Sequence, residues 1–123
     1  MPKMLLSIKP FYASLIVAGD KTVEFRKFHC KKGIDTILIY ATSPIRKIIG
    51  EVALLNIIEG DLEEIWLLTK DSSGLSKKEY TKYYGDRKLA VAYLLGQVTV
   101  YDEPLDLKDV GLNYIPRSFA YIE

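Results

Sequence analysis

The chain has 123 residues, of which 49% are hydrophobic and 27% are charged. This length and composition suit one compact core, so we expect residues 1–123 to form a single domain with no disordered tail. No apolar window is long enough to span a bilayer, and the N-terminal apolar run is broken by Lys9 and Pro10, unlike a signal peptide. We therefore expect a soluble cytoplasmic protein with no membrane association.

The side chains that usually bind metals are scarce. Cys30 is the only cysteine and His29 the only histidine, which excludes an internal disulfide and a Cys/His zinc site. Phosphate-loop, dinucleotide-binding, metalloprotease and serine-elbow motifs are also absent from the sequence. We expect neither a metal nor a cofactor.

The formal net charge of +1 conceals an uneven distribution. Residues 1–50 contain nine lysines and arginines against three acidic residues, a formal charge of +6, which leaves the rest of the chain at −5. Such asymmetry can produce a positive face that attracts phosphates, although a solvated lysine-rich edge is an equally ordinary outcome.

In the first part of the chain, residues 4–9 predict a short strand. A helix follows, with Pro10 in its first turn and Gly19 at its end. Residues 22–28 alternate apolar and polar side chains, which predicts a strand, and residues 36–42 form a β-branched run typical of a largely buried strand.

The second part of the chain begins with an unusually long strand. Residues 47–60 are long for one straight strand, and Gly50 lies where a bulge or bend would let the strand curve. Two helices follow, with capping residues Asp61 and Ser76, and residues 89–101 return as apolar strand sequence. The pattern predicts a mixed α+β fold: a small curved sheet or β-barrel, with one short helix after the first strand and two helices in the middle.

The segment after the first helix concentrates polar side chains on one strand. Residues two apart project to the same side, so we expect Thr22, Glu24 and Arg26 to line one surface while the apolar residues between them face the core. Lys21, in the preceding turn, can reach the same surface. A carboxylate between two cations would orient both and leave donors free for a phosphate, a carbonyl or a base edge. The alternative is an ordinary ion pair on a solvated sheet face.

Three further candidates have simpler structural interpretations. His29 and Cys30 point to opposite faces of an extended segment, which favours an inert thiol over a nucleophile pair. Glu79 can act as a general base, but its position three residues after Ser76 favours helix capping. The tyrosines can stack on nucleobases, although filling the core is their commoner role.

The segment SIKPFYASLIVAGDKTVEFRK, with Lys-Pro opening a short helix and a Gly-x-Lys-x-x-Glu-x-Arg motif after it, resembles the ASCH domain family. This family is similar to the C-terminal part of activating signal cointegrator 1 and is grouped with the PUA-like β-barrels. The resemblance extends through IYATSPIRKIIGEV, AVAYLLG and IPRSFAYIE, and so covers nearly the whole chain.

The resemblance implies a small barrel with a cleft beside the first helix that binds RNA or a modified nucleoside. Matching the family's motif position by position gives the central cleft residues, with others at the helix entrance, after the central strand and in the closing segment. The central cleft residues are Lys21, Glu24 and Arg26. The others are Lys9 and Tyr12 at the helix entrance, Ser43 after the central strand, and Arg117 and Ser118 in the closing segment.

Some bacterial relatives hydrolyse the amide of N4-acetylcytidine with a lysine, a threonine three residues later and a glutamate, and others are described as ribonucleases. Lys21 matches that lysine, but Glu24 occupies the threonine position and Glu79 is a loose match to the glutamate. Without the hydroxyl nucleophile, Lys21 and Glu24 would act as a catalytic pair through water.

Three hypotheses about function follow. The domain binds RNA or a nucleotide-like small molecule in a cationic cleft, or it is a small hydrolase of a modified nucleoside or of RNA at the same place. As a third alternative, it is a regulatory module with a protein partner, which predicts an exposed apolar patch in place of a cationic cleft.

Overall fold

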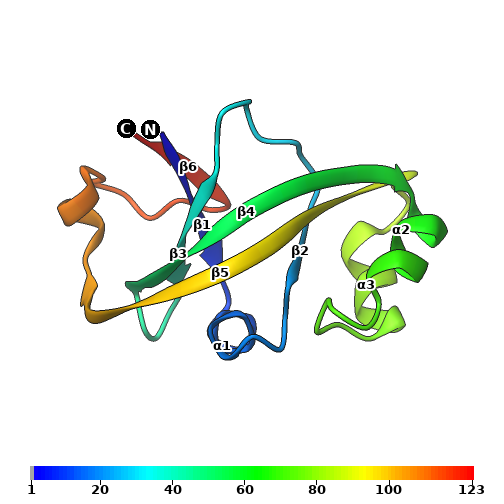
Figure 1. Cartoon of the computed structure of the whole chain (residues 1–123), viewed down its shortest axis with the longest axis horizontal. Helices are drawn as coiled ribbons and strands as arrows, with labels where there is room; N and C mark the ends of the chain where they lie inside the picture. The colour runs from blue at the N-terminus through cyan, green and yellow to red at the C-terminus, as the bar shows by residue number, and fades with distance from the viewer. Residues whose placement is uncertain (1) are drawn as a thin grey trace.

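A computed structural model describes residues 2–123 of the chain (Figure 1). The strands are β1 (Lys3–Ile8), β2 (Val23–Arg26), β3 (Thr36–Ala41), β4 (Lys47–Asp61), β5 (Leu89–Leu105) and β6 (Phe119–Ile122). The helices are α1 (Pro10–Ala18), α2 (Leu62–Thr69), α3 (Lys77–Tyr84) and the 3-10 helix η1 (Leu107–Val110). The mixed α+β composition and the position of each α-helix are as predicted.

All six strands belong to one sheet with the order β2-β5-β4-β3-β1-β6. β1 is parallel to β3, and the other neighbouring pairs are antiparallel. The edge strands β2 and β6 have four residues each and do not pair with one another among residues 2–123. The curved mixed sheet is therefore confirmed, and the closed barrel is wrong.

The curvature comes from the long strands β4 and β5, which run together across the molecule (Figure 1). Their register shifts at three places, one of them between Ile48 and Gly50. A Cβ atom on Gly50 would lie 2.5 Å from the carbonyl oxygen of Thr99, so a side chain cannot be accommodated without moving the backbone. The predicted irregularity at Gly50 is confirmed, and such bulges bend and twist the strand.

Both capping predictions are confirmed. Asp61 Oδ2 accepts hydrogen bonds from the backbone N–H groups of Glu63 and Glu64 at the start of α2. Ser76 and Glu79 form a complete capping box at the start of α3. These local interactions fix the start of α2 and of α3, the two helices inserted between β4 and β5.

The helices and the sheet enclose three apolar clusters. One lies between α1 and the sheet, where Ala13 and Ile16 are buried. A second joins β2 to α2 and α3 and contains Phe25 and Trp66, and a third lies on the sheet near η1. None of the helices within residues 2–123 has the length and apolar character needed to cross a membrane.

Candidate functional site

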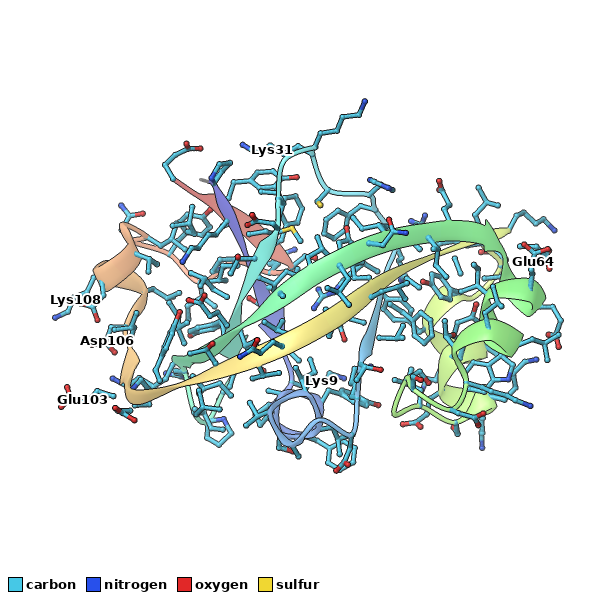
Figure 2. All side chains as sticks on the ribbon, in the orientation of Figure 1. Lys9, Lys31, Glu64, Glu103, Asp106 and Lys108 are labelled. Carbon is cyan, nitrogen blue, oxygen red and sulfur yellow. The ribbon has the colours of Figure 1, made fainter. Side chains whose placement is uncertain are left out.

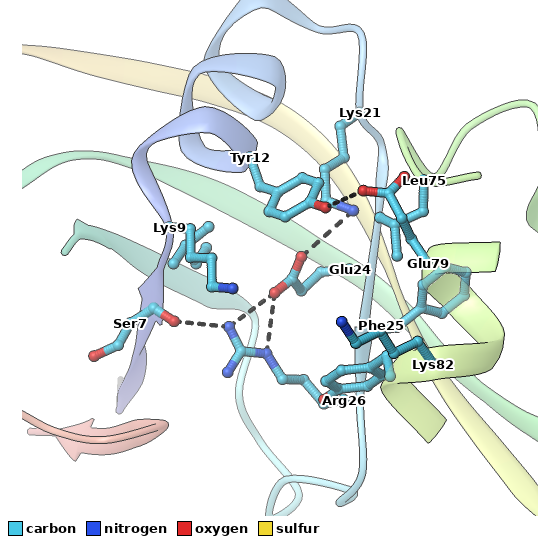
Figure 3. A pocket seen from close by; sticks show the side chains of 12 residues that line it. Ser7, Lys9, Tyr12, Lys21, Glu24, Phe25, Arg26, Leu75, Glu79 and Lys82 are labelled. Atoms are coloured by element: carbon cyan, nitrogen blue, oxygen red, sulfur yellow. Dashed lines mark hydrogen bonds and ion pairs between the residues drawn. The ribbon is translucent and has the colours of Figure 1, made fainter. Parts of the chain in front are cut away.

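A pocket of about 540 Å³ opens between α1, the end of β1, β2 and α3 (Figure 3). One wall comes from the start of α1 and the opposite wall from α3 and the loop before it. The lining residues are Ser7, Ile8, Lys9, Tyr12, Lys21, Glu24, Phe25, Arg26, Leu75, Glu79, Lys82 and Tyr83.

Strand β2 forms the floor of this pocket. Its alternation sends Val23 and Phe25 into the apolar cluster beneath α2 and α3, while Glu24 and Arg26 line the pocket and are only 8% and 9% exposed. Thr22 does not line the pocket with them. β2 begins at Val23, and Thr22 is an exposed residue whose backbone N–H and carbonyl form hydrogen bonds with other segments of the chain. The expectation that Thr22 shares the surface of Glu24 and Arg26 is wrong.

The guanidinium group of Arg26 is held by three separate parts of the chain. Its Nε and Nη2 atoms both donate to Glu24 Oε2, at 3.0 and 2.8 Å. Nη2 also donates to the Ser7 carbonyl oxygen at 3.0 Å, and Nη1 donates to Ser118 Oγ at 3.3 Å. Four of its five N–H groups are thus engaged within the protein, so fewer donors remain for a ligand than the sequence suggested.

Lys21 completes the floor and is 2% exposed. Its Nζ atom lies 3.5 Å from Glu24 Oε1 and donates to the Ser73 carbonyl oxygen. Burial lowers the pKa of Lys21 from its ordinary value, and the nearby Glu24 carboxylate opposes this effect. Glu24 therefore lies between two cations, with one oxygen toward Lys21 and the other toward Arg26 (Figure 3).

A hydrogen bond crosses the pocket between its two walls. The Tyr12 hydroxyl on α1 donates to Glu79 Oε2 on α3 at 2.9 Å, while Glu79 Oε1 accepts from the Ser76 N–H. The hydrogen bonds from Ser76 and Tyr12 lower the pKa of Glu79. The capping role of Glu79 is confirmed, and its role as a general base stays a prediction.

Two exposed lysines lie at the pocket rim. Lys9 stands at the start of α1 and Lys82 on α3, and neither has an ion-pair partner within residues 2–123. Lys9 was expected from the sequence to line the cleft, whereas Lys82 and Leu75 were not. The spacing of Glu79, Lys82 and Tyr83 is the signal that could have found this wall, since residues three and four apart share one helix face.

The remaining candidates lie outside the pocket wall. Ser43 is exposed in the turn between β3 and β4, and Arg117 is exposed before β6. Ser118 does not line the pocket, but its hydroxyl oxygen accepts a hydrogen bond from Arg26 in the pocket floor. Within the part of the chain that the structure describes, no three His, Cys, Asp or Glu side chains are grouped closely enough to hold a metal ion.

The open, curved six-stranded sheet and its helices match the ASCH/PUA-like fold. Residues 6–100 match the model of the ASCH domain. The chain belongs to the ASCH domain family.

Its relatives include proteins of similar size and much longer ones. It is 34% identical over 115 residues to an ASCH domain-containing ribonuclease of Zymomonas mobilis, covering 91% of this chain and 78% of that protein. A crystal structure of ASCH from Zymomonas mobilis is 31% identical, with a TM-score of 0.90 over 98% of this chain and 87% of that one. The chain is also 33% identical over 121 residues to the Ureaplasma parvum protein named ATP synthase subunit alpha, covering 98% of this chain but 15% of that protein.

Proposed function

We propose that the pocket binds one nucleotide unit of RNA. The observation that carries this proposal is the presence of Lys9 and Lys82, which have no ion-pair partner in the described part of the chain, at the rim of a pocket with tyrosines in its walls. Four basic and two acidic side chains line the pocket, which favours an anionic ligand. The similarity to a protein named as a ribonuclease also supports an RNA ligand.

Each part of the pocket suits one part of a nucleotide. Lys9 and Lys82 are free to meet phosphate oxygens, which fix position without reading sequence. The rings of Tyr12 and Tyr83 offer apolar surface on which a base can stack. At the floor, Glu24 Oε1 and the remaining N–H of Arg26 offer an acceptor and a donor to base or ribose.

Fluorescence anisotropy with labelled single-stranded and hairpin RNAs at two salt concentrations tests this proposal. Combining Lys9→Ala with Lys82→Ala removes two phosphate contacts, so we expect roughly tenfold weaker binding and a salt slope smaller by about 1.4. The matched control combines Lys70→Ala with Lys108→Ala, two exposed lysines outside the pocket. Figure 2 shows Lys108 beside η1, far from Lys9.

Equal affinity of the wild type and the pocket variant for both RNAs would count against the proposal. So would an equal loss of affinity in the control, because the effect would then reflect net charge and not the pocket.

RNA cleavage at the same floor is a second candidate function. It is favoured by the ribonuclease name of the Zymomonas mobilis relative and by the buried Lys21–Glu24 pair, in which burial lowers the pKa of Lys21. Glu24 Oε1 would accept the proton of a ribose 2′-hydroxyl, and the 2′-oxygen would attack the adjacent phosphorus while the Lys21 ammonium stabilises negative charge on the phosphoryl group. The P–O5′ bond would break, and the leaving 5′-oxygen would take a proton from water to become a hydroxyl.

Incubation of labelled single-stranded RNA with the protein, followed by chromatography, tests for cleavage. We expect the wild type to form fragments ending in 2′,3′-cyclic phosphate and Glu24→Gln to lose at least a hundredfold in rate. Glu59→Gln, at an exposed position on β4, is the matched control. Fragments that accumulate at the same rate with Glu24→Gln would exclude this role, and a parallel panel of N4-acylated cytidines tests amide hydrolysis.

A further inference from the structure

We infer that the pocket is one end of a longer binding path and that its ligand is an oligonucleotide and not a free nucleotide. The path continues from the pocket rim over Tyr83 onto two further cations, Lys27 and Arg87, which we call the outer ledge. The outer ledge binds a backbone phosphate next to the nucleotide held in the pocket. This inference rests on the proposed function.

Tyr83 connects the pocket to the outer ledge. Its side chain lines the pocket, and the Nζ atom of Lys27 lies 4.7 Å from the centroid of its ring. Lys27 directly follows Arg26, in the bend after β2, so one cation lies in the pocket floor and the next lies over the Tyr83 ring.

Arg87 is exposed in the turn directly after α3, four residues after Tyr83. Its backbone N–H donates to the Tyr84 carbonyl oxygen, which holds it directly after the last turn of the helix. The charges of Arg26 and Arg87 both act to lower the pKa of Tyr83, against a larger increase caused by burial.

The two ledge cations, Lys27 and Arg87, have no ion-pair partners within residues 2–123. Elsewhere on the surface, Lys47 pairs with Asp106 and Lys77 pairs with Glu63. Asp86 precedes Arg87 but forms no ion pair with any ledge cation.

Clustered cations without partners repel one another. A polyanion that places a phosphate among them relieves this repulsion and releases its own counterions. A nucleoside monophosphate seated in the pocket has no second phosphate to place there, whereas an oligonucleotide does.

The test compares two ligands on one protein: the four nucleoside monophosphates, followed by calorimetry, and a labelled five-nucleotide single-stranded RNA, followed by anisotropy. The ledge variant combines Lys27→Met with Arg87→Met, which removes both charges and keeps an aliphatic side chain over Tyr83. Lys70→Met with Lys108→Met is the control, and circular dichroism verifies that both variants are folded.

We expect the ledge variant to bind monophosphates within twofold of the wild type. We expect it to bind the five-nucleotide RNA roughly tenfold more weakly, with a salt slope smaller by about 0.7 because one phosphate contact is lost. Unchanged RNA affinity, or equal weakening for both ligands, would overturn the outer ledge while leaving the pocket proposal intact. Failure of the wild type to bind either ligand would overturn the proposed function and the ledge together.

Discussion

Glu24 is the residue on which the charge balance of the pocket floor depends. Its carboxylate lies 3.5 Å from Lys21 Nζ and 2.8 Å from Arg26 Nη2, and all three side chains are buried. Removing the charge from Glu24 leaves two cations with little access to water. A buried cation without its partner is costly, so the ion-pair network stabilises the native state only while it is complete.

We therefore predict that Glu24→Ala lowers the free energy of unfolding by about 3–5 kcal/mol, as expected when one partner of a buried ion pair is removed. Urea denaturation followed by circular dichroism measures this change. Glu59→Ala, at an exposed position on β4 with no ion-pair partner within residues 2–123, should change stability by less than about 0.5 kcal/mol. Similar small losses in both variants would contradict the prediction.

The positions of individual side chains were predictable where the alternation of a single strand decides which way they point. Strand alternation places Glu24 and Arg26 together, and both do line the pocket. The same rule fails for Thr22 because the strand starts one residue later. Lys82 and Leu75 reach the pocket only because α3 packs beside β2, a long-range contact that no local pattern specifies.

Among the elements, β4 shows how one glycine permits the curvature of the sheet. Gly50 pairs with Val100 of β5 next to a register shift, and the backbone of Thr99 occupies the space of a side chain. The strands can approach this closely only without a Cβ atom.

Gly50→Ala is expected to lower the free energy of unfolding by about 1–3 kcal/mol, because the methyl group must push the β5 backbone away. Thermal and urea unfolding measure the loss. Gly60→Ala, also on β4, is the control, since its new Cβ would meet only side-chain atoms of Glu64 and Ile65. A larger loss at Gly60 than at Gly50 would show that close backbone contact is not the cause.

The helices and strands were predictable because the residues that mark their ends are close to them in the sequence. Pro10 begins α1, Gly19 ends it with a positive φ of 83°, and caps open α2 and α3. The full length of β5 was harder to predict, since it continues past Gly96 and through Pro104 to Leu105. Pairing with β4 extends it beyond what its own residues indicate.

At the scale of the whole molecule, the ASCH family and the curved α+β fold were predictable, but the open sheet was not. Closure depends on whether β2 and β6 meet, and these strands are separated by most of the chain. The single domain, the cytoplasmic location and a protein partner stay predictions. Leu67 and Leu68 on α2 are exposed, but two neighbouring apolar side chains do not define a partner.

Arg26 spans the place where the sheet stays open, joining β2 to Ser7 near the start of the chain and to Ser118 near its end. During synthesis on a ribosome, its guanidinium group cannot acquire all of these partners until the segment around Ser118 has emerged. The complete pocket floor therefore assembles late, after most of the sheet is available. A nascent chain paused before that segment would present an incomplete pocket floor, in which Arg26 lacks its Ser118 partner.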